Sequence, residues 1–331
     1  MDSGGIKLAV YYYISESKDG WLNLAVDNFF IHNLSKNDIL LYFYINKNAV
    51  IIGKSQNAWR ECNLDAMERD KTQLVRRHTG GGAVFHDENN LNFSFVMSEK
   101  NYDLARQLDV VCRVITKLGL EPEISGRNDI LIDGKKFSGN AFASIRNMRS
   151  HHGTLLINTD LNRLSNYLNV SEKKMNAKGI KSVKSRVCNL CDFDPSITVS
   201  QVLNIFRQEF AKEYGEAEEY KFNDGELAEV DKLYKEQMSW EWKLGRTPSF
   251  DYAIEERFSF GEIQILFDVR EGRIIDVTVY TDALDTEIVS SVKDVLIGVK
   301  FSPIDIAQAL YTDKQKTEFI EMADYIKTIS F

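Results

Sequence analysis

Residues 76–87 hold the most unusual run of residues in the chain, which reads Arg76-Arg77-His78-Thr79-Gly80-Gly81-Gly82-Ala83-Val84-Phe85-His86-Asp87. Three consecutive glycines weaken a helix or strand interior, but they let the backbone come very close to a ligand. Consecutive N–H groups in such a loop can form a concave anion site. The two arginines offer planar forks of donors that suit phosphate or carboxylate. The stretch therefore predicts a loop that holds a ligand with an anionic part, followed by a strand over residues 83–85.

Taken alone, the glycines also fit a flexible turn between two strands. Two known phosphate loops are excluded by the sequence. No Gly-x-x-x-x-Gly-Lys-Ser/Thr occurs, and no Gly-x-Gly-x-x-Gly follows a strand. A bound phosphate would therefore need a loop of another type.

Composition places the chain among ordinary globular proteins. It has 331 residues, of which 44% are hydrophobic and 27% charged, and this length allows two domains. The net charge of −8 disfavours nucleic acid as a partner, because nucleic-acid binding requires a basic surface. No apolar stretch approaches the ~20 residues of a membrane span, and the first residues do not form a signal peptide. We therefore expect a cytoplasmic protein without a membrane partner.

The four cysteines do not form a recognisable metal or redox motif. Cys188 and Cys191 form a Cys-x-x-Cys pair, but no second pair supplies the two further ligands that zinc needs. We expect unpaired, reduced thiols.

The N-terminal part alternates predicted strands and helices. Strands are predicted over 7–14 and 91–95, a hairpin over 39–45 and 49–52, and helices over 21–34 and 104–118. The apolar residues of the segment 21–34 fall on one face at helical spacing, which predicts the helix there. The strand over 91–95 is expected to pair with the strand that leaves the glycine loop.

The rest of the chain carries a second hairpin and a separate C-terminal unit. Asp133-Gly134 is a strong tight-turn signal between strands over 129–132 and 135–144. A strand over 151–157, a short helix from Asp160 through Leu168, a polar, basic and mobile loop over 169–185, and helices over 200–214 and 226–240 are expected next. A break over 245–249 precedes a hairpin of strands 262–269 and 274–280, then helices from Asp285 and Ser302. These last residues predict a small α+β domain.

Four polar segments lie at predicted strand ends or in loops: 76–86, 126–129, 135–139 and 151–154. Together they supply cations, a carboxylate, hydroxyls and glycines, a mixture that suits the reaction of a carboxylate with a phosphate. Asp129 can hold Mg²⁺ through oxygen, and Lys136 can neutralise an α-phosphate and a reacting carboxylate at once. The alternative for Lys136 is an exposed lysine in a hairpin. The alternative for residues 169–185 is a solvated loop without function.

Taken in order, these segments resemble lipoate–protein ligase, the bacterial enzyme with a large catalytic and a small C-terminal domain. The resemblance is carried by Ile52-Gly53-Lys54-Ser55-Gln56-Asn57, the arginine–glycine loop through Asp87, Gly126-Arg127-Asn128-Asp129, Lys136-Phe137-Ser138-Gly139, His151-His152-Gly153-Thr154-Leu155-Leu156, Ala177-Lys178-Gly179-Ile180-Lys181-Ser182-Val183, Trp240-Glu241-Trp242 and Phe267-Asp268-Val269. The combination is specific, although no single piece is. Biotin ligases share the fold and the adenylating chemistry, but they do not usually have this form of the arginine–glycine loop.

The resemblance implies an α+β fold: a catalytic domain of the biotin/lipoate ligase type over 1–246, with mixed β-sheets flanked by helices, and a smaller α+β domain over 250–331. It implies that lipoate and Mg²⁺-ATP give lipoyl-adenylate and pyrophosphate. A lysine of an apo lipoyl domain then takes the lipoyl group. The implied acceptors are 2-oxo acid dehydrogenase acyltransferase subunits or the glycine cleavage H protein, and the ligase is expected to be a monomer.

The resemblance also assigns site residues. Lys136 would be catalytic, bridging the lipoate carboxyl and the α-phosphate, and Asp129 would be the Mg²⁺ ligand. The nucleotide and the acyl-adenylate would be held by Arg77, Gly80, Gly81, Gly82, Ala83, Val84, Phe85, Asn128, Lys136, His152, Thr154, Lys178 and Gly179. Lipoate would be held by Arg77, His86, Lys136 and His152. His78 departs from the family pattern, which often has Ser or Thr at this position.

Two other functions share part of this pattern. Lipoyl or octanoyl transferases have the same fold but use a cysteine or another acyl-transfer route instead of ATP. A degenerate, non-catalytic homologue would bind lipoate or an acceptor, but degeneration usually removes a charged site residue, and the arginine, aspartate and lysine are all present here.

Overall fold

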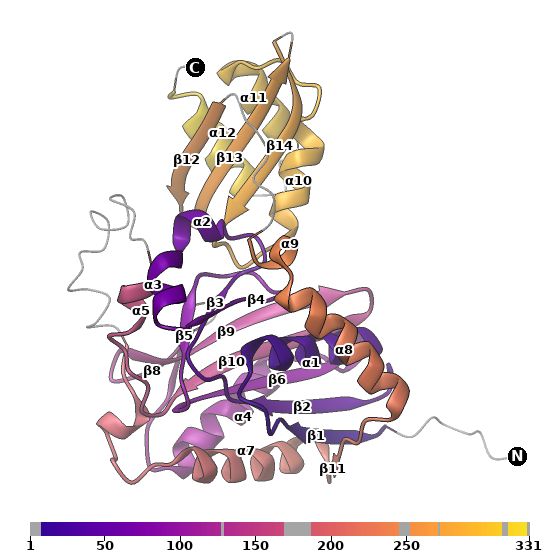
Figure 1. Ribbon diagram of the computed structural model, residues 1–331, viewed down its shortest axis with the longest axis vertical. Coiled ribbons are helices and arrows are strands. Elements are labelled where there is room, and N and C mark those ends of the chain that lie inside the picture. The colour runs from indigo at the N-terminus through magenta and orange to yellow at the C-terminus, as the bar shows by residue number, and fades with distance from the viewer. Residues whose placement is uncertain are drawn as a thin grey trace, which may run out of the picture.

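The computed structural model describes residues 8–126, 129–168, 187–244, 252–270, 272–312 and 317–329, apart from the side chains of 59 and 60. Three sheets form its framework (Figure 1). The eight-stranded sheet has the order β11-β1-β2-β6-β10-β9-β8-β7, with β1 (Val10–Ile14), β2 (Ile39–Tyr44), β6 (Asn90–Ser98), β7 (Glu123–Ser125), β8 (Asp129–Ile132), β9 (Lys135–Ile145), β10 (Met148–Leu156) and β11 (Glu218–Glu219). β1 pairs in parallel with β2 and β11, while the pairs from β2 through β7 are antiparallel, so the sheet is mixed.

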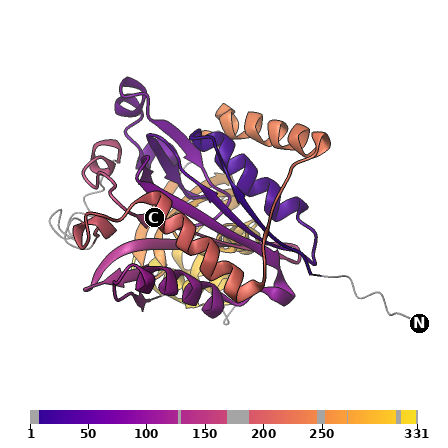
Figure 2. The same cartoon turned by 90° about the horizontal axis from the view of Figure 1, so that it is seen from below.

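Helices cover both faces of the large sheet, and Figure 2 shows the two layers from below. The helices are α1 (Gly20–Asn33) and α8 (Asp224–Met238) on one face, and α4 (Leu104–Lys117) and α7 (Val199–Tyr214) on the other. The continuous apolar run of β2 is buried at every position because both faces are covered. Leu41 and Phe43 belong to the core under α4 and α7, whereas Leu40 and Tyr42 belong to the core under α1.

A three-stranded sheet carries the glycine loop. β3 (Ala49–Ile52) pairs in parallel with β4 (Gln73–Arg76) and antiparallel with β5 (Val84–His86). Residues 77–83 connect β4 to β5, so the loop lies at one end of this sheet. Its surroundings include four short helices: α2 (Ala58–Glu61), α3 (Leu64–Arg69), α5 (Leu164–Tyr167) and α9 (Trp240–Lys243).

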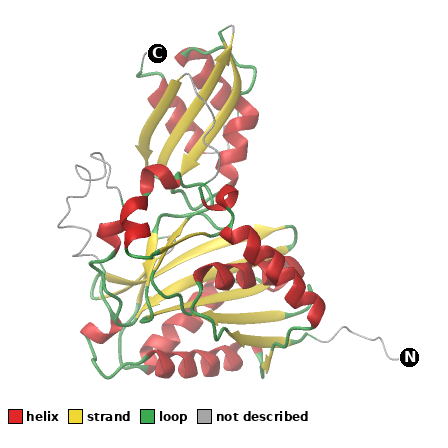
Figure 3. Cartoon of the chain, in the orientation of Figure 1, coloured by secondary structure: helices red, strands yellow, loops and turns green. Residues whose placement is uncertain are grey.

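The C-terminal residues build a core of their own, and Figure 3 shows at its top the strands and helices that supply it. β12 (Tyr252–Phe258), β13 (Gly261–Arg270) and β14 (Arg273–Thr281) form an antiparallel sheet. The inward side chains of this sheet pack against α10 (Glu287–Leu296), α11 (Pro303–Leu310) and α12 (Thr317–Ile326). The predicted α+β fold, with mixed sheets flanked by helices and a smaller α+β part at the C-terminus, is confirmed. The boundary between 246 and 250 lies outside the described residues and stays a prediction.

Several predicted elements are confirmed. The helices over 104–118, 200–214 and 226–240 correspond to α4, α7 and α8, and both C-terminal helices are present as α10 and α11. The hairpin through Asp133-Gly134 is β8 and β9, with both turn residues at positive φ of 51° and 72°. The strand over 151–157 is β10, which begins earlier, at Met148. The predicted loop over 169–185 lies outside the described residues.

Three local predictions are wrong, and two of them concern strand pairing and not element types. The strands over 39–45 and 49–52 do not form a hairpin, because β2 belongs to the large sheet and β3 to the small one. The strand over 91–95 pairs with β2 and β10, while the strand leaving the glycine loop pairs with β3. The helix over 21–34 is confirmed as α1, but its burial is not confined to one apolar face, since the polar Asn23, Asp27 and Asn28 are buried as well. The short helix begins at Leu164, so Asp160 does not cap it.

Candidate active site

The glycine loop is shaped by close backbone contacts. Gly81 has a φ of +93°, which favours glycine strongly. A Cβ on Gly53 would overlap the carbonyl oxygen of Gly81, so these two segments can meet only because residue 53 is glycine. Gly82 is exposed, and a Cβ placed there would meet no atom within 4 Å. The open side of the loop therefore lies at Gly82.

The guanidinium of Arg77 lies inside the loop. Its Nε and Nη2 donate to the carbonyl oxygen of Gly80 at 3.0 and 2.6 Å, and Nη2 also donates to that of Gly82 at 2.9 Å. Nη1 donates to the carbonyl oxygen of Ile51 at 3.3 Å. Burial lowers the pKa of Arg77 to about 10, which leaves the side chain charged at neutral pH. Arg77 thus directs loop carbonyls inward and places a positive charge under the glycines.

The side chains of Arg76 and His78 contact α9. The Arg76 guanidinium donates to the carbonyl oxygen of Gln56 at 2.6 Å and to those of Trp242 and Lys243 at 2.9 and 2.8 Å. The ring of His78 stacks on that of Trp242, with the centroids 4.4 Å apart. Burial lowers the pKa of His78 to about 4, so the ring is neutral at pH 7. Both residues hold α9 against the start of the glycine loop.

His152 connects the loop to the large sheet. It lies on β10, is buried, and its Nε2 is 2.7 Å from the hydroxyl of Thr79. On the other side of the ring, Nδ1 is 3.4 Å from the carboxylate of Asp27 on α1. Asp27 is itself buried, and one of its carboxylate oxygens has no hydrogen-bond partner among the described residues. His152 Nδ1 has no hydrogen-bond partner among the described residues, so the imidazole lies next to the Asp27 carboxylate and is hydrogen-bonded to the glycine loop through Thr79.

Lys136 forms the second part of the site. Its Nζ is 2.7 Å from the carboxylate of Asp129, and both side chains are about one-third exposed, at 33% and 36%. A Cβ on Gly139 would lie 2.8 Å from the Lys136 Cε and Nζ, so the lysine lies across the bare glycine backbone. The amide of Gly139 donates to the Thr154 hydroxyl at 3.4 Å. The neighbouring Lys135 is exposed.

The two parts meet on β10. His152 and Thr154 are two residues apart on this strand, so their side chains point to the same face of the sheet. His152 contacts the glycine loop and Thr154 lies next to Gly139, over which Lys136 extends. The structure therefore brings Arg77, the glycines, His152, Thr154, Lys136 and Asp129 to one region. Asn128, Lys178 and Gly179 lie outside the described residues.

His86, at the end of β5, is also buried in this region. Burial, followed by the charges of Arg77 and His152, lowers its pKa to about 3. The imidazole is therefore neutral at physiological pH. Val84 and Ala83 are half-buried, while Phe85 is buried and packs on Tyr167.

Sequence reasoning missed Thr79 and Asp27. Thr79 lies within the arginine–glycine stretch, but only the fold places His152 beside its hydroxyl. Asp27 carried a usable signal, since it is an acidic residue within the apolar helix segment Leu24 to Ile31. A carboxylate in such a position is rarely buried without a partner.

The C-terminal part contacts the glycine loop directly. The amide of Gly81 donates to the carbonyl oxygen of Ala283 at 2.9 Å, and the amide of Thr281 donates to that of Ser55 at 2.6 Å. The Asn57 side chain donates to the Gln264 side chain at 3.1 Å. In Figure 1 the C-terminal sheet stands above the rest of the chain, and these contacts lie where the two parts meet.

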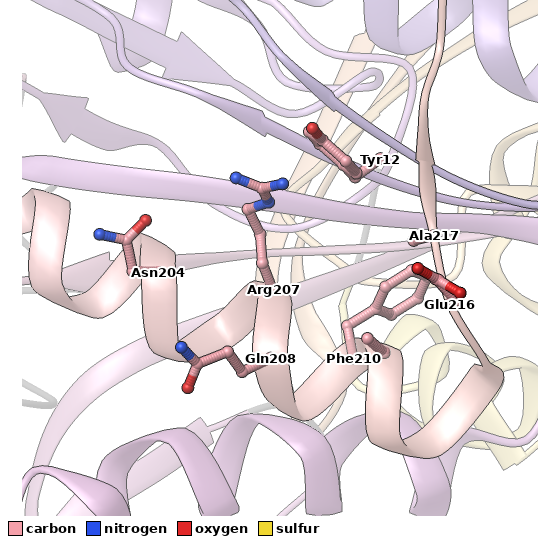
Figure 4. Close-up of a pocket in the computed structure, with 8 residues that line it drawn as sticks. Tyr12, Asn204, Arg207, Gln208, Phe210, Glu216 and Ala217 are labelled. Atoms are coloured by element: carbon pink, nitrogen blue, oxygen red, sulfur yellow. The ribbon is translucent and has the colours of Figure 1, made fainter.

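A cavity of about 420 Å³ lies away from these residues, between α7 and the β1–β11 edge of the large sheet. Arg207 extends over the ring of Tyr12 there, 3.8 Å from its centroid, and Glu216 lies next to Phe210 at another part of the lining (Figure 4). None of the predicted site residues lines this cavity.

The four cysteines are unpaired, as predicted. Burial raises the pKa of Cys188 to about 11, and the thiol lies 3.5 Å from the carbonyl oxygen of Lys135. Burial likewise raises the pKa of Cys62 to about 12 and that of Cys112 to about 11, and it raises the pKa of Cys191. A thiol is nucleophilic only as thiolate, so these environments disfavour a cysteine nucleophile.

Within the described residues, no group of three His, Cys, Asp or Glu side chains is arranged to hold a metal ion. None of the described helices has the length and apolar character of a membrane span.

Comparison with known proteins identifies both parts of the chain. The lipoyl protein ligase A/B catalytic domain matches residues 19–211, and the bacterial lipoate protein ligase C-terminus matches residues 247–328. Lipoate-protein ligase A of Blochmanniella floridana is 37% identical over 300 residues, covering 88% of this chain and 89% of the relative. That of Psychrobacter cryohalolentis is 39% identical over 295 residues, covering 86% and 87%.

Solved structures agree. P. falciparum LipL1 in complex with lipoate superposes with a TM-score of 0.83 at 29% identity, covering 96% of this chain and 99% of the other. A lipoate-protein ligase A bound with ATP gives 0.60 at 27% identity, covering 72% and 98%. The bipartite ligase of Thermoplasma acidophilum, solved in a study of that ligase and its E2 lipoyl domain, gives 0.66 at 28%, covering 75% and 100%. The chain therefore belongs to the lipoate–protein ligase family.

Proposed function

We propose that the chain activates lipoate with ATP and transfers the lipoyl group to a lysine of an apo lipoyl domain. In the first step a lipoate carboxylate oxygen attacks the α-phosphorus, and pyrophosphate leaves as lipoyl-adenylate forms. In the second step the acceptor lysine amine attacks the acyl carbon, AMP leaves, and the amine loses a proton as the amide forms. The placement of Lys136 beside Asp129, on the strand next to His152 and the glycine loop, carries this proposal.

Lys136 supplies the charge that the first step needs. Two anions must approach each other, and a fixed ammonium group between them stabilises the added charge of the transition state. The bare backbone of Gly139 lets the ammonium reach this position from the strand. We propose that Lys136 contacts both the lipoate carboxylate and the α-phosphate.

The glycine loop would receive the nucleotide. Its open side is at Gly82, and the buried Arg77 contributes positive charge from below while holding the loop carbonyls. Arg77 would therefore act on the adenylate through the loop shape and through its field more than through a direct hydrogen bond. The roles of Ala83, Val84, Phe85, Asn128, Lys178 and Gly179 stay predictions.

Mg²⁺ would be held by Asp129 together with the nucleotide phosphates. Mg²⁺ in nucleotide sites is usually held by one or two carboxylates plus substrate phosphates, and the partly exposed Asp129 carboxylate fits this donor set. The bound ion would neutralise charge on the leaving pyrophosphate.

The ATP-independent transferase remains the second candidate, and the buried, poorly ionised cysteines weigh against its thiol route. The likeness to a structure bound with ATP supports the ATP-dependent reaction. We propose acceptors of the 2-oxo acid dehydrogenase acyltransferase type or the glycine cleavage H protein. A monomeric state and a cytoplasmic location stay predictions.

Mass spectrometry of an apo lipoyl domain, incubated with the protein, ATP, Mg²⁺ and lipoate, tests the proposal. A gain of one lipoyl group and an equal amount of pyrophosphate are expected. Two controls omit ATP or replace the acceptor lysine by arginine. Acylation that proceeds without ATP from an octanoylated donor protein would contradict the proposal and favour the transferase.

A further inference from the structure

A network of hydrogen-bonded polar side chains leads from Ser15, just before α1, to His86. The Ser15 hydroxyl donates to Asn23 Oδ1 at 2.6 Å. Asn23 Nδ2 lies 2.9 Å from Asn46 Oδ1, and Asn46 Nδ2 lies 3.0 Å from His86 Nδ1. Asn23, Asn46 and His86 are all buried, with at most 3% of each residue exposed.

Backbone carbonyls determine which groups in this hydrogen-bond network are donors. Asn23 Nδ2 also lies 3.0 Å from the carbonyl oxygens of Ser17 and Ile45, which can only accept hydrogen bonds. The amide nitrogen of Asn23 must therefore face them. Asn46 presents its oxygen to that nitrogen, so it presents its own NH₂ group to His86.

The orientation of Asn46 decides the tautomer of His86. Because the NH₂ group of Asn46 donates to Nδ1, this ring nitrogen must be the acceptor. A neutral imidazole carries its single proton on the other nitrogen, Nε2. The low pKa of His86, caused mainly by burial, keeps the ring neutral at physiological pH.

His86 Nε2 is buried and has no hydrogen-bond partner among the described residues. A buried donor without an acceptor is costly, so such a group usually serves a ligand or an ordered water. His86 is the last residue of β5, the strand that leaves the glycine loop, which places the ring beside the candidate active site. The charges of Arg77 and His152 also contribute to its lowered pKa.

We infer that Asn46 is a positioning residue that holds His86 as the Nε2–H tautomer, so that this N–H donates to an acceptor atom of the acyl substrate. The tautomer follows from the ligand-free structure alone. The ligand contact rests on the proposed function.

Nitrogen-15 NMR of histidine-labelled protein without ligand tests the tautomer. The spectrum of His86→Gln identifies the His86 signals. We expect an unprotonated Nδ1 and a protonated Nε2 in the wild-type protein. A protonated Nδ1 there would overturn the inference, whether or not the protein is a ligase.

Asn46→Asp tests the positioning role. An ionised carboxylate still accepts from Asn23 but cannot donate to His86, so Nδ1 should gain a proton. Asn48→Asp is the matched control, because Asn48 donates to the carbonyl oxygens of Asp70 and Lys71, away from His86. An unchanged His86 signal in a folded Asn46→Asp protein would show that Asn46 does not set the tautomer.

Calorimetric titration with lipoate and octanoate tests the ligand contact. The side-chain NH₂ of glutamine can stand in for Nε2–H, whereas leucine removes the donor. We expect His86→Gln to bind lipoate within a few-fold of the wild-type protein and His86→Leu to bind about tenfold more weakly. If His86→Leu binds both acids more weakly, the acceptor lies at the carboxyl end. If it binds only lipoate more weakly, the acceptor lies at the dithiolane ring. Equal affinities of the two variants for lipoate would overturn the ligand contact. Failure of the wild-type protein to bind lipoate would instead count against the proposed function.

Discussion

The amide of Gly81 donates a 2.9 Å hydrogen bond to the carbonyl oxygen of Ala283, which joins the glycine loop to the C-terminal part of the chain. This N–H is therefore satisfied within the protein and is not a free donor for an anionic ligand. The sequence did not indicate the contact, because neither residue carries a charged or polar side chain. It makes the C-terminal part a direct neighbour of the loop proposed to bind the adenylate.

Gly80→Ala should weaken this contact. A Cβ on Gly80 would lie 2.5 Å from the Ala283 carbonyl oxygen and closer still to that of Leu284, so one segment must move. We expect the free energy of unfolding to fall by about 1–3 kcal/mol, as for other overpacked sites. Hydrogen exchange of the Thr281 amide, which is bonded to Ser55, should become faster.

Gly82→Ala is the control for this substitution, since its Cβ would meet open space. It should leave both the stability and the Thr281 exchange rate close to wild type. If the Thr281 amide exchanged as slowly in the Gly80→Ala protein as in the wild-type protein, the contact would not be what holds the two parts together.

Lys136→Ala should abolish most lipoyl-adenylate formation. Loss of a charge that stabilises a transition state typically lowers the rate about 10²–10³-fold. Lys135→Ala should have a mild effect, because Lys135 is exposed and Lys136 is the one paired with Asp129. Pyrophosphate release with saturating ATP and lipoate measures both. Equal, large losses would mean that the roles of the two lysines have been assigned wrongly.

Gly139→Ala should displace Lys136 without unfolding the protein. The added Cβ would lie 2.8 Å from the Lys136 Cε and Nζ, and the flexible end of the side chain can move away. We expect adenylate formation to slow by about tenfold or more while the melting temperature changes little. Unchanged pyrophosphate release in this variant would indicate that the lysine does not act from across Gly139.

Replacement of Cys62, Cys112, Cys188 and Cys191 by Ser or Ala should preserve most ATP-dependent ligation. Burial raises the pKa of each thiol, so none is a ready nucleophile. Some stability should be lost at the buried Cys62 and Cys188. Acceptor mass gain measures the activity, and complete loss in a folded Cys188→Ala protein would favour the acyltransferase reaction.

A protein that ends at Arg246 should separate the two half-reactions. The site residues named above precede this point, so binding of lipoyl-adenylate and transfer from it should persist. Formation of the adenylate should be poor, since the glycine loop would lose its contact with Ala283. Pyrophosphate release and transfer from supplied lipoyl-adenylate are measured separately. Similar losses in both steps of a folded truncated protein would contradict this division of labour.

The sequence by itself determined many of the element types and the family to which the chain belongs. Turn residues such as Asp133-Gly134 and helical periodicity over 104–118 act locally, so their outcome does not depend on distant partners. The order of the motifs was specific enough to indicate the family, which the comparisons show. The glycines and the basic and acidic side chains of the site were also visible, because each stands in a short stretch of unusual composition.

Only the tertiary structure decided which strands pair and which polar groups meet. Asn46-Lys47-Asn48 has the composition of a hairpin turn, but it carries the chain from the large sheet to the small one. Pairing is a non-local choice, and alternation along a strand does not name its partner. The contacts of Thr79 with His152 and of Asn46 with His86 join residues that are far apart in the sequence. They arise because α1, β5 and β10 are packed together by the two cores, and no local signal encodes that packing.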